Sequence, residues 1–241
     1  MILEVSVKKA LPSFDLNLTL KVGAGELKVL IGPSGAGKST IIRMIAGLEK
    51  PDEGLIEYHG EKWVDTARKI FVKPQKRVVG YVFQDYRLFP HLTVYQNAAF
   101  AAQDKRKVED LLHLFGIWGL KDFMPHKISG GERQRCAICQ NLARDPRVLL
   151  LDEPFSALDA ENRRKLRREL KALKREMPLP IIHVTHDLGE AMFLGDEVVP
   201  IVHGAIAPEW LERQLAEARA EEAGSSLGQS GGHAVQSHCR A

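Results

Sequence analysis

The feature that most constrains the fold of this chain is a glycine-rich segment that ends in a lysine and two hydroxyl residues. It follows the apolar run 28–31 and leads into the helix-forming residues 41–45. A strand, a G-x-x-x-x-G-K-[ST] loop and a helix in this order are the context of a phosphate-binding P-loop, because the glycines let backbone N–H groups turn toward phosphate oxygens. The segment comprises Gly32, Pro33, Ser34, Gly35, Ala36, Gly37, Lys38, Ser39 and Thr40.

Two side chains of this loop have predicted roles. We expect Lys38 to contact the β and γ phosphates of a nucleotide and Ser39 to ligate Mg²⁺. The start of the following helix adds a dipole that favours phosphate. A glycine-rich turn without a ligand is the alternative, and the flanking strand and helix disfavour it.

A second pattern supports the phosphate site. Residues 148–151 form an apolar run that ends in Asp152 and Glu153. A strand that ends in two carboxylates can hold Mg²⁺ and polarise water beside a P-loop. We expect Asp152 to support the metal from its second shell and Glu153 to act as general base or to position the water. On its own, the pair could also be an ordinary acidic junction between a strand and a loop.

The remaining periodicities predict an α/β fold. Apolar runs at 181–184 and 198–202 are typical of buried parallel strands. Residues 2–7 and 14–22 alternate apolar and polar side chains, which indicates an antiparallel pair with one solvated face. The pattern is helical from about 84 to 129. The predicted fold is a P-loop NTPase core with a mixed sheet, an antiparallel β subdomain and a helical insertion subdomain.

Composition sets the predicted boundaries. The 241 residues, 44% of them hydrophobic, suffice for one core and a small subdomain, which we expect over residues 1–223. Residues 224–241 are rich in Gly, Ser, Gln and His and are predicted to be a disordered tail. The 34 basic and 31 acidic residues nearly cancel, so bulk charge does not favour a nucleic-acid partner.

The sequence also indicates a compartment. No stretch approaches the roughly 18 to 20 apolar residues of a membrane-spanning helix, and Glu4 stands where a signal peptide requires a basic start. We expect a cytoplasmic protein whose contact with a membrane comes through a partner.

Three cysteines argue against a disulfide framework. Cys136 and Cys139 lie in a helical pattern and are interpreted as small buried hydrophobic residues rather than as a redox or metal motif. His233, His238 and Cys239 could bind a metal, but the predicted tail offers no preorganised scaffold.

Four further segments occur in a fixed order along the chain. They are Gln84 within 82–85, Ser129, Gly130 and Gly131 within 128–134, the segment 156–159, and His186 within 184–187. With the P-loop and the carboxylate strand, they resemble the ATP-binding-cassette family from about residue 2 to residue 210.

The resemblance implies ATP and Mg²⁺ as cofactors and ATP hydrolysis coupled to transmembrane transport. Ser129, Gly130 and Gly131 open a helix and would bind the γ-phosphate of the facing subunit's nucleotide, which implies a head-to-tail homodimer with two composite sites. Gln84 would reach the Mg²⁺ and the attacking water. His186 would hydrogen-bond the γ-phosphate.

Several of these residues also have an ordinary structural interpretation. Gln84 could be a surface hydrogen-bonding residue and Asp159 a helix N-cap, whereas His183 is interpreted as a satisfied structural histidine. Two positions depart from the family pattern. Glu132 stands where glutamine is commoner, and Phe14 is a candidate for the aromatic residue that stacks on adenine, with a core position as the alternative.

A single cassette without a fused membrane span resembles the energy subunit of a multi-chain importer. Such a subunit is partnered by membrane permeases and, indirectly, by an extracytoplasmic substrate-binding protein. Residues 80–94, with 64–65 and 74–77 upstream, are most similar to the ATPases of molybdate and tungstate importers. The predicted function is therefore to power uptake of such an oxyanion from the inner face of the membrane.

Alternatives remain open at this point. Sulfate, polyamine and sugar importer ATPases share a weaker version of the same pattern. A non-transport cassette protein that acts on nucleic acid or ribosomes, and a regulatory module that no longer hydrolyses ATP, are the rival classes. Tyr86, Leu88 and Phe89 are expected to form a permease docking site, with internal packing of the insertion as the alternative.

Overall fold

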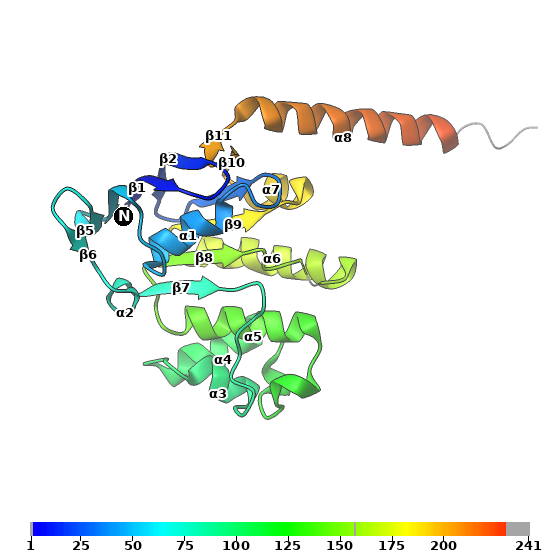
Figure 1. Cartoon of the computed structure of the whole chain (residues 1–241). Coiled ribbons are helices and arrows are strands. Elements are labelled where there is room, and N and C mark those ends of the chain that lie inside the picture. Colours follow the sequence, from blue (N-terminus) through cyan, green and yellow to red (C-terminus); the bar gives the residue numbers. More distant parts are fainter. Residues whose placement is uncertain (1, 157, 230–241) are drawn as a thin grey trace, which may run out of the picture. The chain divides into compact units, whose positions relative to one another are not determined.

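The computed structural model describes residues 2–156 and 158–229. These residues divide into a first unit that ends at Ile206 and a second unit that begins at Ala207. The first unit contains two sheets and the helices that pack on them (Figure 1).

The central sheet of the first unit has six strands in the order β11-β10-β3-β9-β8-β7. Its strands are β3 (Leu27–Ile31), β7 (Val79–Val82), β8 (Val148–Asp152), β9 (Ile181–Thr185), β10 (Glu197–Val202) and β11 (Ala205–Ile206). Strands β10, β3, β9, β8 and β7 are parallel, and β11 is antiparallel to β10. The predicted mixed sheet is confirmed, and β3 and β9 are buried along their whole length.

The second sheet is antiparallel and has the order β2-β1-β4-β5-β6. Its strands are β1 (Ile2–Ala10), β2 (Asp15–Gly23), β4 (Glu53–Tyr58), β5 (Glu61–Asp65) and β6 (Ile70–Phe71). Every second residue of β1 and β2 is buried over most of their length, as the alternating pattern predicted. This sheet is the predicted antiparallel β subdomain.

Helix α1 (Lys38–Ala46) packs between the two sheets. Its buried residues Ile41, Ile42 and Ile45 share one core with Val5 of β1 and Leu150 of β8. Because apolar side chains contact α1 from both sheets, the first turn of the helix is held at the carboxyl end of β3.

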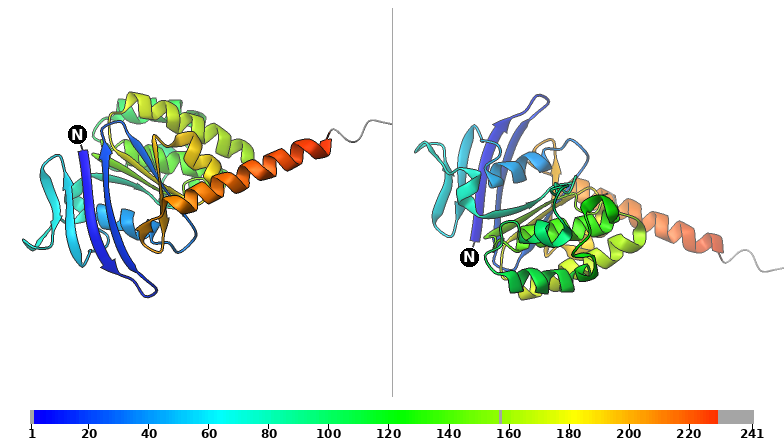
Figure 2. Two further views of the ribbon diagram at one scale, coloured as in Figure 1. Left: turned by 90° about the horizontal axis from the view of Figure 1, so that it is seen from above. Right: turned by 90° about the horizontal axis from the view of Figure 1, so that it is seen from below.

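The other helices lie mostly away from the antiparallel sheet (Figure 2). They are α2 (Pro74–Arg77), α3 (Val94–Ala99), α4 (Lys105–Leu114), α5 (Gly130–Leu142), α6 (Ala160–Glu176) and α7 (Leu188–Leu194), with short 3-10 turns at Trp118–Leu120 and Pro125–Lys127. Helices α3 and α4 pack on α5 and form the predicted helical insertion. Within the described ranges, no helix is both long and apolar enough to cross a bilayer.

The second unit consists of α8 (Pro208–Gln229) in the part of the chain that the structure describes. The helix crosses the boundary predicted at residue 223, so residues 224–229 are helical, where the sequence had predicted a disordered tail. The preceding residues are rich in Ala, Glu and Arg, which are strong helix formers, and an established helix extends more readily than a new one starts. The rest of the predicted tail, with His233, His238 and Cys239, lies outside the described residues.

A buried arginine at the end of α2 supports the last turn of α1. The Arg77 guanidinium donates to the Met44 oxygen at 2.8 Å, to the Ile45 oxygen at 2.7 Å and to the Val72 oxygen at 2.8 Å. The last carbonyls of a helix lack partners within the helix, so Arg77 supplies a donor to the Ile45 oxygen and a second donor to the Met44 oxygen, which also accepts from the Gly47 N–H at 3.1 Å. Burial lowers the pKa of Arg77 to about 10, which leaves it charged at neutral pH.

We predict that Arg77→Met destabilises the protein by about 3 kcal/mol, because three buried carbonyl acceptors each lose a hydrogen bond worth about 1 kcal/mol. Urea unfolding followed by circular dichroism measures the change. Arg68→Met removes an exposed arginine from the same subdomain and should leave the unfolding midpoint almost unchanged. Equal midpoints for the two variants would contradict the capping role.

Candidate functional site

The glycine-rich loop lies between β3 and α1, and two of its glycines are required by its geometry. A Cβ atom at Gly32 would lie 2.0 Å from the Ile201 oxygen. Gly37 precedes α1 with a φ of 96°, in the left-handed region that favours glycine. The loop therefore has the strand, turn and helix context that the sequence predicted for a P-loop.

Lys38 lies in the first turn of α1 and points back into the loop. Its side chain is nearly buried, and its Nζ donates to the Gly32 oxygen at 2.7 Å and to the Pro33 oxygen at 2.9 Å. Burial lowers the pKa of Lys38, and the charges of Glu153 and Asp152 act in the opposite direction. The loop thus concentrates an ammonium group and a helix N-terminus, both of which favour an anion.

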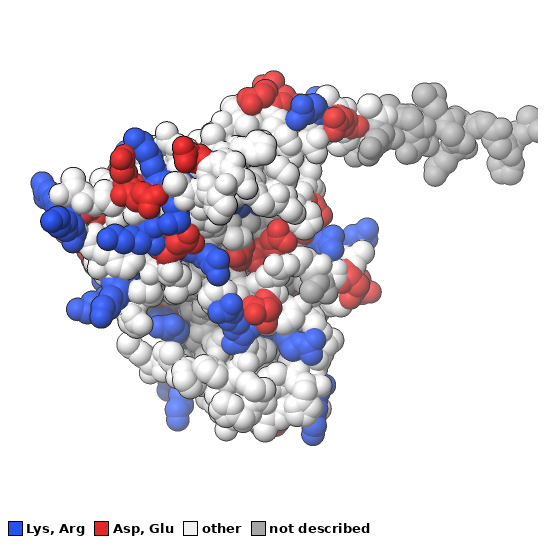
Figure 3. Space-filling model, viewed as in Figure 1, with Lys and Arg blue, Asp and Glu red and all other residues white. Residues whose placement is uncertain are grey.

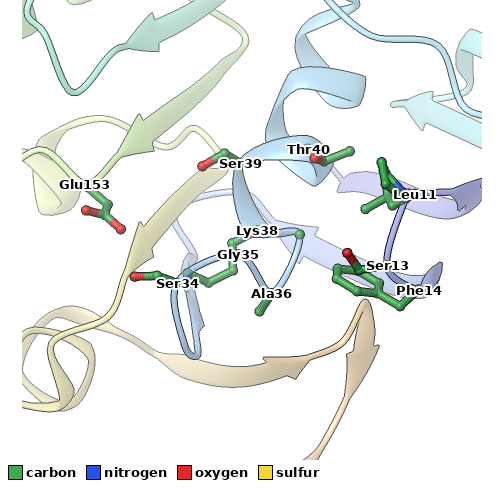
Figure 4. A pocket seen from close by; sticks show the side chains of 12 residues that line it. Leu11, Ser13, Phe14, Ser34, Gly35, Ala36, Lys38, Ser39, Thr40 and Glu153 are labelled. Carbon is green, nitrogen blue, oxygen red and sulfur yellow. The ribbon is translucent and has the colours of Figure 1, made fainter.

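A cavity of about 380 Å³ opens beside the loop (Figure 4). Its walls are the loop residues Ser34, Gly35, Ala36, Gly37, Lys38, Ser39 and Thr40, together with Glu153 and the hairpin residues Leu11, Pro12, Ser13 and Phe14. The volume is within the range of small-molecule sites, about 300 to 1,000 Å³. Every predicted P-loop residue lines this cavity except Gly32 and Pro33, whose carbonyls bind Lys38.

Phe14 belongs to this cavity rather than to the core. Its ring is half-buried and lies 5.8 Å from the ring of His203 in an edge-on contact. An aromatic face in the wall of a polar cavity can stack on a planar base. The sequence left open whether Phe14 lies in the core or beside the nucleotide site, and the structure places it in the cavity wall.

The three predicted metal residues line one cavity. Ser39 Oγ donates to Asp152 Oδ1 at 2.8 Å, and a space of about 690 Å³ is lined by Ser39, Gln84 and Asp152 among others. A hydroxyl, a carboxylate and an amide oxygen form the hard oxygen donor set that Mg²⁺ prefers, so these residues fit that ion.

Tyr81 also contacts this group, and sequence reasoning did not identify it. Its hydroxyl donates to Asp152 Oδ2 at 2.9 Å. Burial, followed by the charge of Asp152, raises the pKa of Tyr81 well above its ordinary value, so the phenol stays neutral and donates. The available signal was a tyrosine inside an apolar strand three residues before Gln84.

Glu153 and His186 face each other across the ends of β8 and β9. The distance from Glu153 Oε1 to His186 Nδ1 is 3.3 Å. Glu153 has a φ of 47°, and its N–H donates to the Val184 oxygen at 3.0 Å. A non-glycine residue held in the left-handed region stores backbone strain, a feature that clusters at functional sites.

A buried acid supports the segment that carries His186. Glu190 accepts from Thr185 Oγ1 at 2.6 Å, and its other oxygen lies 3.0 Å from Arg167 Nη2. Asp187 caps α7 and lies 3.3 Å from the same arginine nitrogen. These contacts tie the end of β9 to α6 and α7, on both sides of His186.

His183 lies beside this acid. It is fully buried, as predicted, with its ring edge-on to Phe155. The prediction that it is hydrogen-bonded is wrong, because in the described residues neither ring nitrogen has a hydrogen-bond partner and Glu190 Oε2 is 3.6 Å from Nε2.

The Ser-Gly-Gly segment lies at the start of α5. Ser129 caps this helix, its Oγ accepting from the Glu132 N–H at 3.3 Å, while Glu132 Oε2 accepts from the Ser129 N–H at 2.7 Å. Glu132, the departure from the family pattern, therefore completes a capping box. None of Ser129, Gly130 and Gly131 is among the described residues that line the P-loop cavity.

Other predictions concern residues outside the cavity. Asp159 is the N-cap of α6, as the structural interpretation expected. Cys136 and Cys139 are buried free cysteines, and burial raises both of their pKa values. In the described ranges, no cluster of three or more His, Cys, Asp or Glu could hold a metal. The predicted burial of the two cysteines is confirmed.

The predicted docking residues lie in the segment between β7 and α3. Tyr86, Leu88 and Phe89 are half-buried. Tyr86 packs beside Arg133, whereas Phe89 stacks on Phe100 with ring centroids 4.3 Å apart. Phe100 is 60% exposed, so the pair of Phe89 and Phe100 combines internal packing with an apolar surface.

A phosphate loop between a parallel strand and a helix, beside a strand that ends in carboxylates, defines a nucleotide-hydrolysing protein of the P-loop class. The family described as ABC transporter matches residues 16–156. The chain therefore belongs to the ABC transporter family, and it is an ATP-binding, ATP-hydrolysing transport enzyme.

Individual relatives agree with this assignment. The chain is 41% identical over 233 residues to the molybdate/tungstate import ATP-binding protein WtpC of Archaeoglobus fulgidus. The matched region covers 94% of each chain. It is 43% identical over 215 residues to the probable sulfate/thiosulfate import ATP-binding protein CysA of Chlorella vulgaris. This matched region covers 85% of this chain and 89% of the relative. Among solved structures, a dimeric post-hydrolysis state of the ATP-binding cassette MJ0796 bound to ADP and Pi matches with a TM-score of 0.70 and 28% identity, over 86% of this chain and 96% of the other.

The Glu190 cluster generates a prediction about pH. Burial alone would raise the pKa of Glu190, but His183, Thr185 and Arg167 outweigh it and lower the pKa from 4.5 to about 2. The charged group therefore contributes stability that is fully present above about pH 4.5 and is lost as the pH falls toward 2. The contribution at neutral pH is at most about 3 kcal/mol.

We predict that Glu190→Gln is less stable than the wild type at pH 7 and that the difference shrinks as the pH falls below about 4.5. Urea unfolding at a series of pH values measures the difference. Glu161→Gln, at the exposed start of α6, controls for the loss of one carboxylate. A difference that stays constant between pH 7 and the acid limit of folding would refute the assignment of the low pKa.

Proposed function

We propose that this chain is the ATP-hydrolysing subunit of an importer and that it works as a head-to-tail homodimer. The observation that carries the proposal is the separation of the Ser-Gly-Gly segment from the P-loop cavity of the same chain. Residues 34–40 of the P-loop and Glu153 line one cavity, and Ser39 also lines a second cavity with Asp152, whereas Ser129 caps a helix that contributes to neither. The dimeric cassette structures and the relatives named as import ATP-binding proteins support the same arrangement.

In this proposal, ATP lies in the P-loop cavity with its base on Phe14 and its phosphates along the start of α1. Lys38 compensates the charge of the β and γ phosphates, and the N–H groups of the loop donate to their oxygens. Phe14 and Glu153 lie on opposite sides of the loop in Figure 4, which is the separation that a base and a terminal phosphate require.

Hydrolysis is assigned to Glu153 with His186 and Gln84. Glu153 accepts a proton from the attacking water, and His186, 3.3 Å from it, donates to the γ-phosphate and so aligns the base with the phosphorus. Ser39, Asp152 and Gln84 would hold Mg²⁺, which neutralises charge on the β and γ phosphate oxygens when bound.

The facing subunit completes the site. The N-terminus of α5, a helix of 13 residues, presents N–H groups and a favourable dipole to the γ-phosphate of its partner's nucleotide. The Ser129–Glu132 capping box orders this terminus before the partner arrives. Two such contacts, related by a two-fold axis, give two composite sites.

Permease subunits are the proposed membrane partners, and a substrate-binding protein is an indirect one. The docking surface is the cluster of Tyr86, Leu88, Phe89 and Phe100. On the face of the molecule shown in Figure 3, the part that carries α3 and α4 has few charged side chains, which favours an apolar partner. Elsewhere on the face shown in Figure 3, acidic and basic groups are interspersed, an arrangement that does not favour nucleic acid. The complex would lie peripherally on the cytoplasmic face of the membrane.

The proposed cargo is a tetrahedral oxyanion, molybdate or tungstate. Its support is the resemblance over residues 64–94 and the WtpC relative, which matches over 94% of both chains. The sulfate/thiosulfate relative is slightly more identical but covers less of this chain, so sulfate is the second candidate. Because the ATPase does not contact cargo, the docking surface selects the substrate only through the permease that it binds.

We predict that Glu153→Gln still binds ATP but hydrolyses it at least about a hundredfold more slowly, because the isosteric amide keeps the packing and removes the base. With ATP and Mg²⁺, this variant should elute as a dimer in size-exclusion chromatography. Wild-type protein should release phosphate, and Glu161→Gln should match it. A monomeric Glu153→Gln at saturating ATP would argue against composite sites, and wild-type protein without phosphate release would favour the regulatory alternative.

We predict that deletion of the gene lowers cellular molybdenum or tungsten at limiting supply, because uptake of the oxyanion loses its energy source. Elemental analysis of washed cells measures the change, and complementation with the wild-type gene should restore it. Unchanged metal content together with lost uptake of sulfate, polyamine or sugar would replace the oxyanion and leave the ATPase assignment intact.

A further inference from the structure

Tyr81 contacts the proposed metal site, but the functions assigned so far give it no role. It lies on β7 opposite Leu150 of β8 and is 8% exposed. Its hydroxyl donates to Asp152 Oδ2 at 2.9 Å, while Ser39 donates to Asp152 Oδ1 at 2.8 Å. Each oxygen of the Asp152 carboxylate therefore has its own donor, and the two bonds together fix the plane of the group. With Ser39 alone, the carboxylate could rotate about its terminal torsion, which is a soft one.

The backbone of Tyr81 is held by α5. Strand β7 is at the edge of the six-stranded sheet, so one side of it has no neighbouring strand. On that strand, the Tyr81 N–H donates to Asn141 Oδ1 at 2.9 Å, and Asn141 Nδ2 donates in turn to the Ala137 oxygen at 2.8 Å. Asn141 lies near the end of the helix that begins after Ser129. A shift of α5 would thus be transmitted directly to the Tyr81 backbone.

The ring of Tyr81 is in contact with the segment that carries Gln84. The ring centroids of Tyr81 and Phe83 are 4.1 Å apart. The Arg87 guanidinium lies 4.0 Å from the Phe83 centroid. Tyr86 and Arg87 have φ values of 63° and 48°, a conformation that non-glycine residues adopt only at a cost. The segment after Phe83 is therefore strained, and it is linked to Tyr81 through the Phe83 ring, which contacts the Tyr81 ring at an interplanar angle of 32°.

We propose that Tyr81 is a positioning residue for Asp152, and that it links the geometry of the metal site to α5 and to the Gln84 segment. The inference rests on the proposed Mg²⁺ site. The phenol donates to the carboxylate oxygen that Ser39 leaves free, and its position is set by Asn141 on one side and Phe83 on the other. Groups that orient metal-supporting carboxylates in this way typically contribute about 10- to 100-fold to metal affinity or activity.

The test is the affinity of the full-length Tyr81→Phe protein for Mn²⁺ in the presence of ATP, measured from the electron paramagnetic resonance signal of free Mn²⁺. We expect affinity to fall about tenfold, because the substitution removes only the hydroxyl. Binding of ATP without a divalent metal, measured by equilibrium dialysis, should stay unchanged. This split separates a role at the metal from a general weakening of the nucleotide site.

Tyr95→Phe is the matched control. It removes a tyrosine hydroxyl from α3, where the ring packs on Trp118, and it should retain wild-type Mn²⁺ affinity. Phe83→Leu keeps the Tyr81 hydroxyl and removes its stacking partner, so we expect a smaller loss in the same direction. If Tyr81→Phe does not fold, Phe83→Leu decides the question, and unchanged Mn²⁺ affinity in that variant overturns the proposal.

The outcomes distinguish the positioning role of Tyr81 from the proposed metal site on which it depends. Wild-type Mn²⁺ affinity in a folded Tyr81→Phe protein overturns the positioning role and leaves the proposed function intact. A wild-type protein that binds ATP but takes up no Mn²⁺ removes the proposed metal site itself. Loss of Mn²⁺ affinity in Tyr81→Phe but not in Tyr95→Phe supports the proposal.

Discussion

The packing of α1 between the two sheets is the constraint on which the rest of the structure depends. The helix is buried by the antiparallel sheet on one side and by the parallel sheet on the other, and Arg77 satisfies the carbonyls of its last turn. Its first turn is thereby fixed at the end of β3. The positions of Lys38 and Ser39, and with them the cavity beside the P-loop, follow from this packing rather than from contacts within the loop alone.

The parallel sheet then brings the acidic and basic side chains to one edge. Strands β8 and β9 are neighbours, so Glu153 and His186, each one residue beyond the end of its strand, approach to 3.3 Å. The strained backbone of Glu153 is maintained because its N–H is bonded to β9 and because Glu190 and Arg167 hold the segment on the other side of His186. Buried charge is tolerated there because each group has an opposite charge or a hydroxyl partner.

Asp152 connects the two parts of the site. Through Ser39 it contacts the P-loop, and through Tyr81 it contacts β7, whose backbone is bonded to α5. The composite site that we propose would require α5 to meet a partner subunit's nucleotide. A hydrogen-bonded path from α5 to the metal-supporting carboxylate of the same chain offers a physical way for one site to respond when α5 is engaged at the other.

The sequence by itself determined the P-loop, the carboxylate strand and the positions of the buried strands along the chain, because each depends on a short local pattern. It could not determine whether Phe14 lies in the core or in the cavity wall, that Glu132 completes the cap of Ser129, or that Tyr81 bonds Asp152. It also missed the extension of α8 beyond residue 223 and the unsatisfied nitrogens of His183. The contacts of Phe14, Tyr81 and His183 join segments that are distant in the chain, so only the tertiary structure decided them.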